Sequence, residues 1–420
     1  MKYRGSKCIL SFSIVALLFA SQLVALAEEK KSPIKIGGAM RMNYVHGTYE
    51  GDGRGDGNGD VDLEIFRLNA DIDYQNIIGR IEYRWYPRYF GATSGYSMIH
   101  TAWLGYNLGD LGTLKAGIVR VPFGPGPYGV SSSWFFDQHF YVGLADDMDL
   151  GIRWSDTLGK LTLDVGYYLQ SEFQTDGSSL ASSRYSYDIV RWEEKANADG
   201  DVEWGAGENG FDEQHQLNLR AIYALENIAD LGVSLQYGLL NGTDVDDDGA
   251  NHYAFSAHMK NALAGFTLFS QFSYYTYNIT DDTPWGTGDL IPMGAYDFAW
   301  PIASKGLVPG LSLRYGGIDT SGISWIDSLT PYVEWSTILK TVDDFNSSTL
   351  VTIGASWTLF GALYVYSDFG LSNGNFFVGN VDADGNKEGY GNIYTGAGDF
   401  GANGNNAWNR RVNFNFGYYF

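Results

Sequence analysis

The chain has 420 residues and a formal net charge of −22 at pH 7, which argues against a nucleic-acid-binding protein because such proteins carry basic surfaces. Aromatic residues make up 16% of the sequence and glycines number 54, a composition that favours a large β-structure over a helical protein. The single cysteine, Cys8, lies near the N-terminus, so the rest of the chain is predicted to contain no disulfide and no cysteine metal site.

The first 27 residues have the pattern of a secretory signal peptide. Three basic residues are followed by an apolar run and a small-residue cleavage site: Lys2, Arg4 and Lys7, then 9–24, then 25–27. The run is short for a membrane anchor, and no later run approaches the roughly 20 apolar residues of a membrane helix. We therefore expect export and a mature domain of 28–420, undivided by any Pro/Ser-rich linker.

Segments of roughly 10 residues with alternating polarity recur along the whole chain, the length that a tilted strand needs to cross a bilayer. Sixteen are predicted: 35–46, 62–74, 79–88, 98–108, 113–121, 148–154, 160–172, 215–224, 231–241, 251–262, 265–277, 309–316, 328–338, 350–359, 362–370 and 409–420. Short turns alternate with long polar loops. The pattern predicts an all-β, antiparallel up-and-down transmembrane barrel with short periplasmic turns and long extracellular loops. Segment 290–303 is not counted because Pro301 would lose a ladder hydrogen bond.

The last segment shows most clearly which face is which. Its apolar side chains share one parity and its polar side chains share the other. The apolar side chains are therefore predicted to face lipid and the polar side chains to face the lumen. Its apolar set is Val412, Phe414, Phe416, Tyr418 and Phe420. An ending in alternating aromatics with a terminal Phe resembles the assembly signal of bacterial outer-membrane barrels. That resemblance implies outer-membrane localisation, contact with lipid and lipopolysaccharide, and recognition of Phe416, Tyr418 and Phe420 by the barrel-assembly machinery.

The same parity directs thirteen basic and eight acidic side chains into the lumen, an excess of five positive charges. The residues predicted to line the pore are Arg41, Arg67, Arg80, Glu82, Arg84, Arg88, Lys115, Arg153, Arg220, Arg314 and Arg411. Cations around a narrow aqueous passage concentrate small anions. The alternative is that these arginines only form cross-strand ion pairs, with Glu82 among three of them.

A motif near residue 120 resembles that of a known porin family. Lys115-Ala-Gly-Ile-Val-Arg-Val-Pro-Phe-Gly124 leads into a Ser-rich aromatic loop, and an Asp-x-Gly strand follows at Asp149. The stretch is similar to the family typified by the phosphate-selective porins O and P. The resemblance implies a sixteen-stranded, homotrimeric outer-membrane porin in which loop 123–147 folds into the lumen and narrows it.

The loop departs from that family because it has no Lys or Arg after Arg120. Its candidate constriction residues are Asp137, His139, Asp146 and Asp147. Its aromatic residues are predicted either to anchor it to the wall or to meet sugar rings or a neighbouring protomer: Trp134, Phe135, Phe136, Phe140 and Tyr141. We therefore predict a passive channel for small hydrophilic solutes with weak anion preference. The alternatives are a selective uptake channel for phosphate, other anions or sugar, and a structural or adhesive barrel with a plugged lumen.

Metal binding and catalysis receive less support. Asp244, Asp246 and Asp248 precede Gly249 in a run similar to a calcium loop, so loop-bound Ca²⁺ or Mg²⁺ is one interpretation and a solvated acidic loop is the other. The six histidines show no metal spacing, and no nucleophile elbow is present. We expect no catalytic residue, no enzyme activity and no other cofactor.

Overall fold

The computed structural model describes residues 32–48, 57–87, 95–177, 182–196, 202–342, 345–375, 377–379 and 408–420. The chain divides into two compact units, Met1–Lys35 and Ile36–Phe420. Everything below concerns the second unit. The predicted signal peptide, 1–27, lies outside the described residues. Within these ranges no helix has the length and apolarity needed to cross a membrane.

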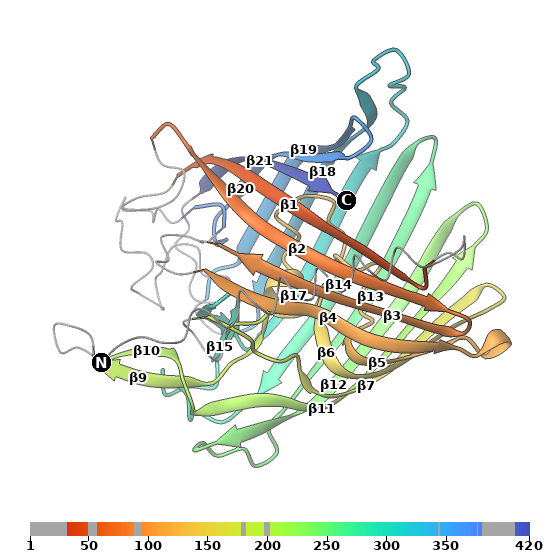
Figure 1. Ribbon diagram of the computed structural model, residues 1–420. Coiled ribbons are helices and arrows are strands. Elements are labelled where there is room, and N and C mark those ends of the chain that lie inside the picture. The colour runs from red at the N-terminus through yellow and green to blue at the C-terminus, as the bar shows by residue number, and fades with distance from the viewer. Residues whose placement is uncertain are drawn as a thin grey trace, which may run out of the picture. The chain divides into compact units, whose positions relative to one another are not determined.

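Sixteen antiparallel strands close into a barrel, as the sequence pattern predicts (Figure 1). They are β1 (Ile34–Gly47), β2 (Asp60–Tyr74), β3 (Ile77–Tyr86), β4 (Tyr96–Asn107), β5 (Thr113–Arg120), β6 (Met148–Leu158), β7 (Leu161–Ser171), β11 (Gly210–Leu225), β12 (Ala229–Thr243), β13 (Asn251–Leu263), β14 (Phe266–Asn278), β17 (Lys305–Tyr315), β18 (Ile326–Lys340), β19 (Ser348–Leu359), β20 (Leu363–Ser372) and β21 (Asn409–Tyr419). Each strand pairs with its neighbour in this order, and β21 returns to β1.

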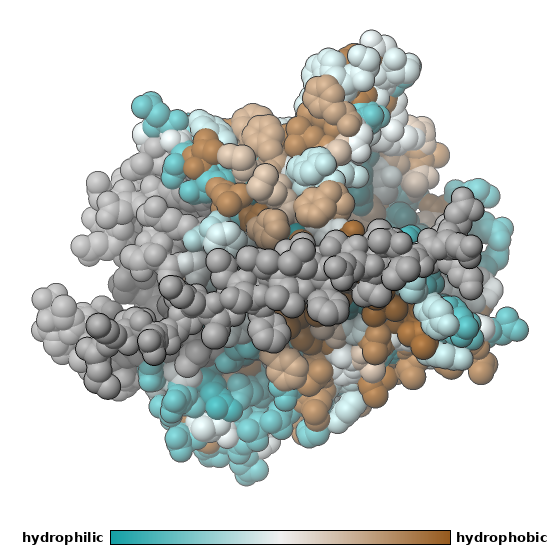
Figure 2. Space-filling view, in the orientation of Figure 1, coloured by the Kyte–Doolittle hydropathy of each residue, from teal (hydrophilic) through white to brown (hydrophobic). Residues whose placement is uncertain are grey.

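Alternating side chains make the wall apolar outside and polar inside. On β21, Phe414 and Phe416 are 38% and 41% exposed, whereas Asn413 and Asn415 are buried. Since successive side chains of a strand point to opposite faces, the exposed phenyl rings cover the outside and the amides face the lumen. Figure 2 shows such hydrophobic side chains gathered on the outer surface.

The barrel closes through a close backbone approach at Gly38. Its amide donates to the carbonyl of Phe420 at 2.9 Å, and the Phe420 amide donates back at 3.1 Å. A Cβ at Gly38 would lie 2.5 Å from both the Arg67 carbonyl oxygen and the Phe420 ring. Glycine is therefore required at the point where the first and last strands meet.

The connections are short at one rim and longer at the other. The short rim has turns such as 75–76, 159–160 and 264–265, while the long rim carries 121–147, 172–209, 279–304 and 373–408. This alternation agrees with the sequence prediction of short turns at one rim and long loops at the other. Turns of two to three residues are sufficient to connect neighbouring antiparallel strands.

Strand boundaries differ from the prediction at Pro309. The segment predicted as 309–316 begins four residues earlier, at Lys305, so Pro309 lies inside a barrel strand. It pairs with Phe272 of β14, but the pairing with β18 is interrupted between Leu307 and Gly310. The missing N–H of proline accounts for this local gap in the ladder.

Segment 290–303, which the prediction left out of the count of barrel strands, forms a hairpin of its own. β15 (Leu290–Ala295) and β16 (Phe298–Ala303) pair with Pro292 opposite Pro301, and they turn at Tyr296 and Asp297, both with positive φ. With β8 (Asp188–Ile189) they form a three-stranded sheet, here called the inner sheet. A separate ribbon joins β9 (Trp192–Ala196) and β10 (Val202–Ala206). The prediction that 290–303 lies outside the barrel wall is confirmed.

Candidate functional site

Loop 121–147, here called the inserted loop, crosses the lumen. Ser131 Oγ donates to Glu334 Oε2 at 2.8 Å, the Trp134 amide donates to Asp368 Oδ2 at 3.0 Å, and Trp134 Nε1 donates to Glu64 Oε1 at 3.0 Å. The three acceptors belong to β18, β20 and β2. A loop that leaves β5 and binds the inner faces of these strands must lie inside the barrel, as the family resemblance implies.

The aromatic side chains of the inserted loop anchor it within the chain. Phe136 stacks on Phe140 with ring centroids 4.1 Å apart, and Tyr141 stacks on Phe377 at 5.7 Å. Phe135 is fully buried, and the Arg411 guanidinium lies 4.5 Å from the centre of the Trp134 ring. Of the predicted alternatives, the described contacts show internal anchoring.

The inserted loop and the inner sheet share one hydrophobic core. It contains Phe140, Tyr141 and Val142 of the loop together with Ile189, Met293 and Trp300 of the three inner strands. Since this core lies inside the wall, part of the lumen is filled by protein. The remaining open part is the candidate channel constriction.

A cavity of about 370 Å³ lies between the inserted loop and the wall. Its lining is polar and aromatic: Arg41, Glu64, Arg67, Arg84, Tyr86, Tyr128, Ser131, Ser132, Ser133, Trp134, Phe136, Phe140, Tyr141, Asp146, Tyr185, Tyr296, Arg314, Thr330, Ser356, Tyr366, Phe377 and Tyr419. Among the described residues of this lining, four arginines face two carboxylates. The cavity therefore has a positive excess.

Glu82 is the centre of an arginine cluster on β2 and β3. Its carboxylate lies 2.6 Å from Arg80, 2.7 Å from Arg84 and 3.6 Å from Arg67, and its side chain is 3% exposed. Asp71 pairs with Arg80 at 2.7 Å. Two carboxylates thus face three guanidinium groups, which leaves one positive charge in excess, and Arg67 and Arg84 extend it to the cavity.

The other predicted pore residues fall into two groups. Arg41 pairs with Glu64 at 2.7 Å, and Arg153 and Arg220 share Asp164 at 2.6 and 2.8 Å. These pairs agree with the alternative of cross-strand ion pairs holding the wall.

The remaining predicted cations meet rings or carbonyls. Lys115 lies 4.1 Å from the centre of the Trp103 ring, Arg314 lies 4.1 Å from that of Phe269, and Arg411 donates to the Phe377 carbonyl at 2.7 Å. Within the described part of the chain, no ion pair is formed by Arg314. Arg88 lies outside the described residues.

The four candidate constriction residues separate in space. Asp146 lines the cavity and pairs with Arg120 at 2.6 Å. Asp137 accepts hydrogen bonds from the backbone of Val130 and from His139, and so it braces the loop internally. Asp147 points away from the cavity lining and joins a cluster of carboxylates at β6 and β8.

The environments of the two adjacent aspartates oppose each other. Burial alone would raise the pKa of Asp146, but Arg120, His100 and Tyr185 hold it well below its usual range. Burial raises the pKa of Asp147, and the neighbouring Asp188 raises it further. The ionised form is therefore favoured at Asp146 and disfavoured at Asp147.

Residues assigned to other roles are exposed. Asp244, Asp246 and Asp248 lie in the β12–β13 loop, where the Asp248 amide donates to Asp246 Oδ1 at 3.1 Å. Phe416, Tyr418 and Phe420 are 41%, 50% and 55% exposed on the outer face.

Sequence reasoning missed several residues of the cavity. Glu64 lines the cavity although the alternation counted from Arg67 would turn it outward; it lies before Phe66, where the pairing of β2 with β3 begins. Tyr185 and Tyr296 come from long-rim loops, in which no periodicity marks an inward residue. The Arg84 guanidinium lies 4.5 Å from the centre of the Tyr185 ring.

Comparison with known proteins supports the barrel fold. No protein-family profile matches the chain, and no curated protein sequence matches it. Solved structures do. OmpF of Salmonella typhi in complex with daunomycin is 11% identical with a TM-score of 0.55, covering 92% of this chain and 97% of its own. The outer membrane channel DcaP of Acinetobacter baumannii is 11% identical with a TM-score of 0.53, covering 94% and 100%.

A third similar structure is OmpT, an outer membrane protein of Vibrio cholerae, at 10% identity and a TM-score of 0.52, covering 94% of this chain and 100% of its own. At such identities the likeness shows the fold alone. Together with the closed sheet, it confirms the predicted class of sixteen-stranded antiparallel barrel.

Proposed function

We propose that this protein is an outer-membrane porin, a passive channel for small hydrophilic solutes with weak anion preference. The observation that carries the proposal is the arginine-lined cavity between the inserted loop and the wall. Transport through it needs no catalysis, because bore width and wall charge suffice for selection. The neighbouring structures named outer membrane channel and outer membrane protein support the location.

The outer surface supports placement in a bilayer. Strand positions such as Leu217, Val233, Phe255 and Ile353 present apolar side chains that are 41% to 55% exposed. Exposure of such a continuous apolar surface to water is unfavourable, whereas contact with lipid tails is favourable. The polar inner face would then hold water.

Arg314 offers a direct test of anion preference because its removal orphans no paired carboxylate among the described residues. In a planar bilayer with a salt gradient, the reversal potential is expected to show anions more permeant than cations. Arg314→Gln is expected to reduce this preference. Lys160→Gln, which removes a 48% exposed cation paired with Glu226 at a short turn, is the control and should leave the potential unchanged. A cation preference in the unaltered protein would refute the anion assignment.

A plugged, structural barrel is the second candidate, favoured by the shared core of the inserted loop and inner sheet. Absence of single-channel conductance from folded protein would support it over the porin. A phosphate-selective channel has less support, because 121–147 contains no Lys or Arg. Saturation of the conductance by phosphate at low concentration would instead favour the phosphate-selective channel.

We also propose a homotrimer in contact with lipopolysaccharide, assembled by the barrel machinery through Phe416, Tyr418 and Phe420. Their exposed outward rings support the last assignment. Mass measurement of the detergent-extracted protein tests the trimer, and a single-protomer mass would exclude it.

A further inference from the structure

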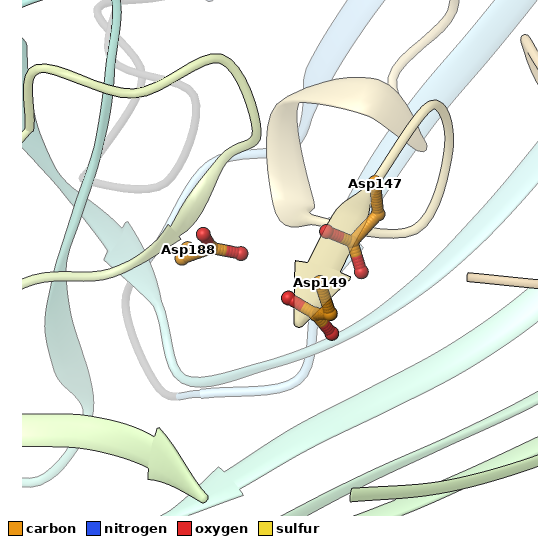
Figure 3. A group of neighbouring side chains, drawn as sticks. All are labelled: Asp147, Asp149 and Asp188. Carbon is orange, nitrogen blue, oxygen red and sulfur yellow. The ribbon is translucent and has the colours of Figure 1, made fainter. Parts of the chain in front are cut away.

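Three aspartates converge where the inserted loop ends. Asp147 and Asp149 flank the start of β6, and Asp188 lies in β8 of the inner sheet. One carboxylate oxygen of each lies within 4.8 Å of the other two, and Figure 3 shows the side chains turned toward a common space. Two oxygens bound to one Ca²⁺ at about 2.4 Å can be at most about 4.8 Å apart. The spacing therefore fits a single ion.

These carboxylates are buried and incompletely satisfied. Asp147 is 5% exposed, and Asp149 and Asp188 are each 1% exposed. Within the described ranges, Oδ1 of Asp147 and Oδ1 of Asp149 have no hydrogen-bond donor. Leaving a buried polar atom without a partner is costly, and a charged one more so. The two orphan oxygens point to a bound ligand.

The surrounding charge points to a cation. Glu172 and Glu213 are also buried and interact electrostatically with the same aspartates. Oε2 of Glu172 likewise lacks a donor among the described residues. Arg184 supplies a positive charge at 3.0 Å from Asp188. Five carboxylates therefore surround this point, and one guanidinium cannot balance them.

We propose that Asp147, Asp149 and Asp188 bind one hard divalent cation, Ca²⁺ in preference to softer metals, with Glu172 and Glu213 balancing its charge. The donors are all oxygens, which suits Ca²⁺ and Mg²⁺ and disfavours metals that seek nitrogen or sulfur. Ligands drawn from two separate chain segments, the start of β6 and β8, favour Ca²⁺, which tolerates variable coordination better than Mg²⁺.

Such an ion ties the inner sheet to the barrel wall. Asp188 pairs with Gly294 in the inner sheet, while Asp149 belongs to barrel strand β6. The segments already touch, because the Met148 amide donates to Ser186 Oγ at 2.8 Å. At Gly143, with φ of +73°, a Cβ would lie 2.6 Å from the Tyr187 carbonyl oxygen. The backbones therefore approach closely beside the proposed ion.

The test uses the full chain, folded in detergent and stripped with a chelator. Ca²⁺ is measured by elemental analysis after dialysis, and Tb³⁺ by luminescence excited through the tyrosines. We expect about one ion per chain, and Ca²⁺ should compete with Tb³⁺ for it. Asp149→Asn and Asp188→Asn should lose the bound ion. Asp110→Asn, at an exposed aspartate in the turn between β4 and β5, is the matched control and should retain it.

Melting temperature gives a second measurement on unaltered protein. Chelation is expected to lower it and Ca²⁺ to restore it, because a ligand that binds only the folded state stabilises that state. Absence of bound Ca²⁺ and of Tb³⁺ luminescence would overturn the proposal, whether or not the aspartate variants fold. Equal binding by folded Asp149→Asn and Asp188→Asn would also overturn it. Neither measurement depends on conductance, so failure of the porin assignment would be seen separately.

Discussion

At the scale of single residues, one buried carboxylate sets the charge balance of the arginine cluster. Glu82 contacts Arg67, Arg80 and Arg84, and two of these line the cavity. Because the guanidinium groups repel one another, they remain close only while the shared anion is present. Glu82 therefore both holds the wall and moderates the positive potential of the passage.

Replacing this anion should change both properties. Glu82→Gln is expected to lower the free energy of unfolding by about 2–3 kcal/mol, because three cations lose a shared acceptor charge. It should also strengthen anion preference. The free energy of unfolding is measured by urea unfolding followed by electrophoretic mobility. The anion preference is measured by the reversal potential. A variant as stable and as selective as the parent would contradict this account.

Asp146 predicts a pH-dependent effect at the inserted loop. Its folded-state pKa is depressed, so its pairing with Arg120 contributes full stability above about pH 4 and loses it as pH falls through the depressed value. Asp146→Asn should cost about 1–3 kcal/mol at pH 7 and progressively less in acid. Unfolding of both proteins across pH checks this. If the stability lost in Asp146→Asn became larger as the pH falls, the pKa of Asp146 would be raised in the folded state and not depressed.

At the scale of elements, alternation predicted the strands well and the loops poorly. All sixteen predicted segments, including 350–359, appear as barrel strands. The prediction succeeds because a barrel strand has one face toward the outside and one toward the lumen, which leaves an alternating pattern in the sequence. Partners such as Tyr185, Tyr296 and Asp188 escaped prediction, since loop contacts depend on folding over long sequence separations. Glu64 escaped because the alternation counted from Arg67 assigns it to the outer face, whereas it lines the cavity.

Opposite faces of β19 provide a matched pair of substitutions. Ile353 is 54% exposed on the outside, whereas Ser356 lines the cavity. In lipid, Ile353→Arg is expected to cost about 2–4 kcal/mol, because a charge faces the bilayer. Ser356→Arg should cost little and reduce cation conductance. Unfolding in lipid vesicles measures the costs, and equal costs would mean that the faces are misassigned.

At the scale of the whole molecule, the cavity beside the inserted loop is small. The cavity volume of about 370 Å³ lies in the range of sites for small solutes. In a liposome-swelling series, entry rates are therefore expected to fall steeply from monosaccharides to disaccharides and trisaccharides. Undiminished entry of a trisaccharide would require a wider passage than the inserted loop leaves.

The pairing of β21 with β1 bears on how the chain folds. Residues 39–47 meet 411–419, the greatest sequence separation of any strand pair in the described sheet. Since loop-closure entropy must be met before such remote contacts form, this pairing is expected to come late. Until then β1 and β21 are unpaired edges that invite aggregation. A helper that shields those edges would raise the yield of closed barrels more than one that speeds any single hairpin.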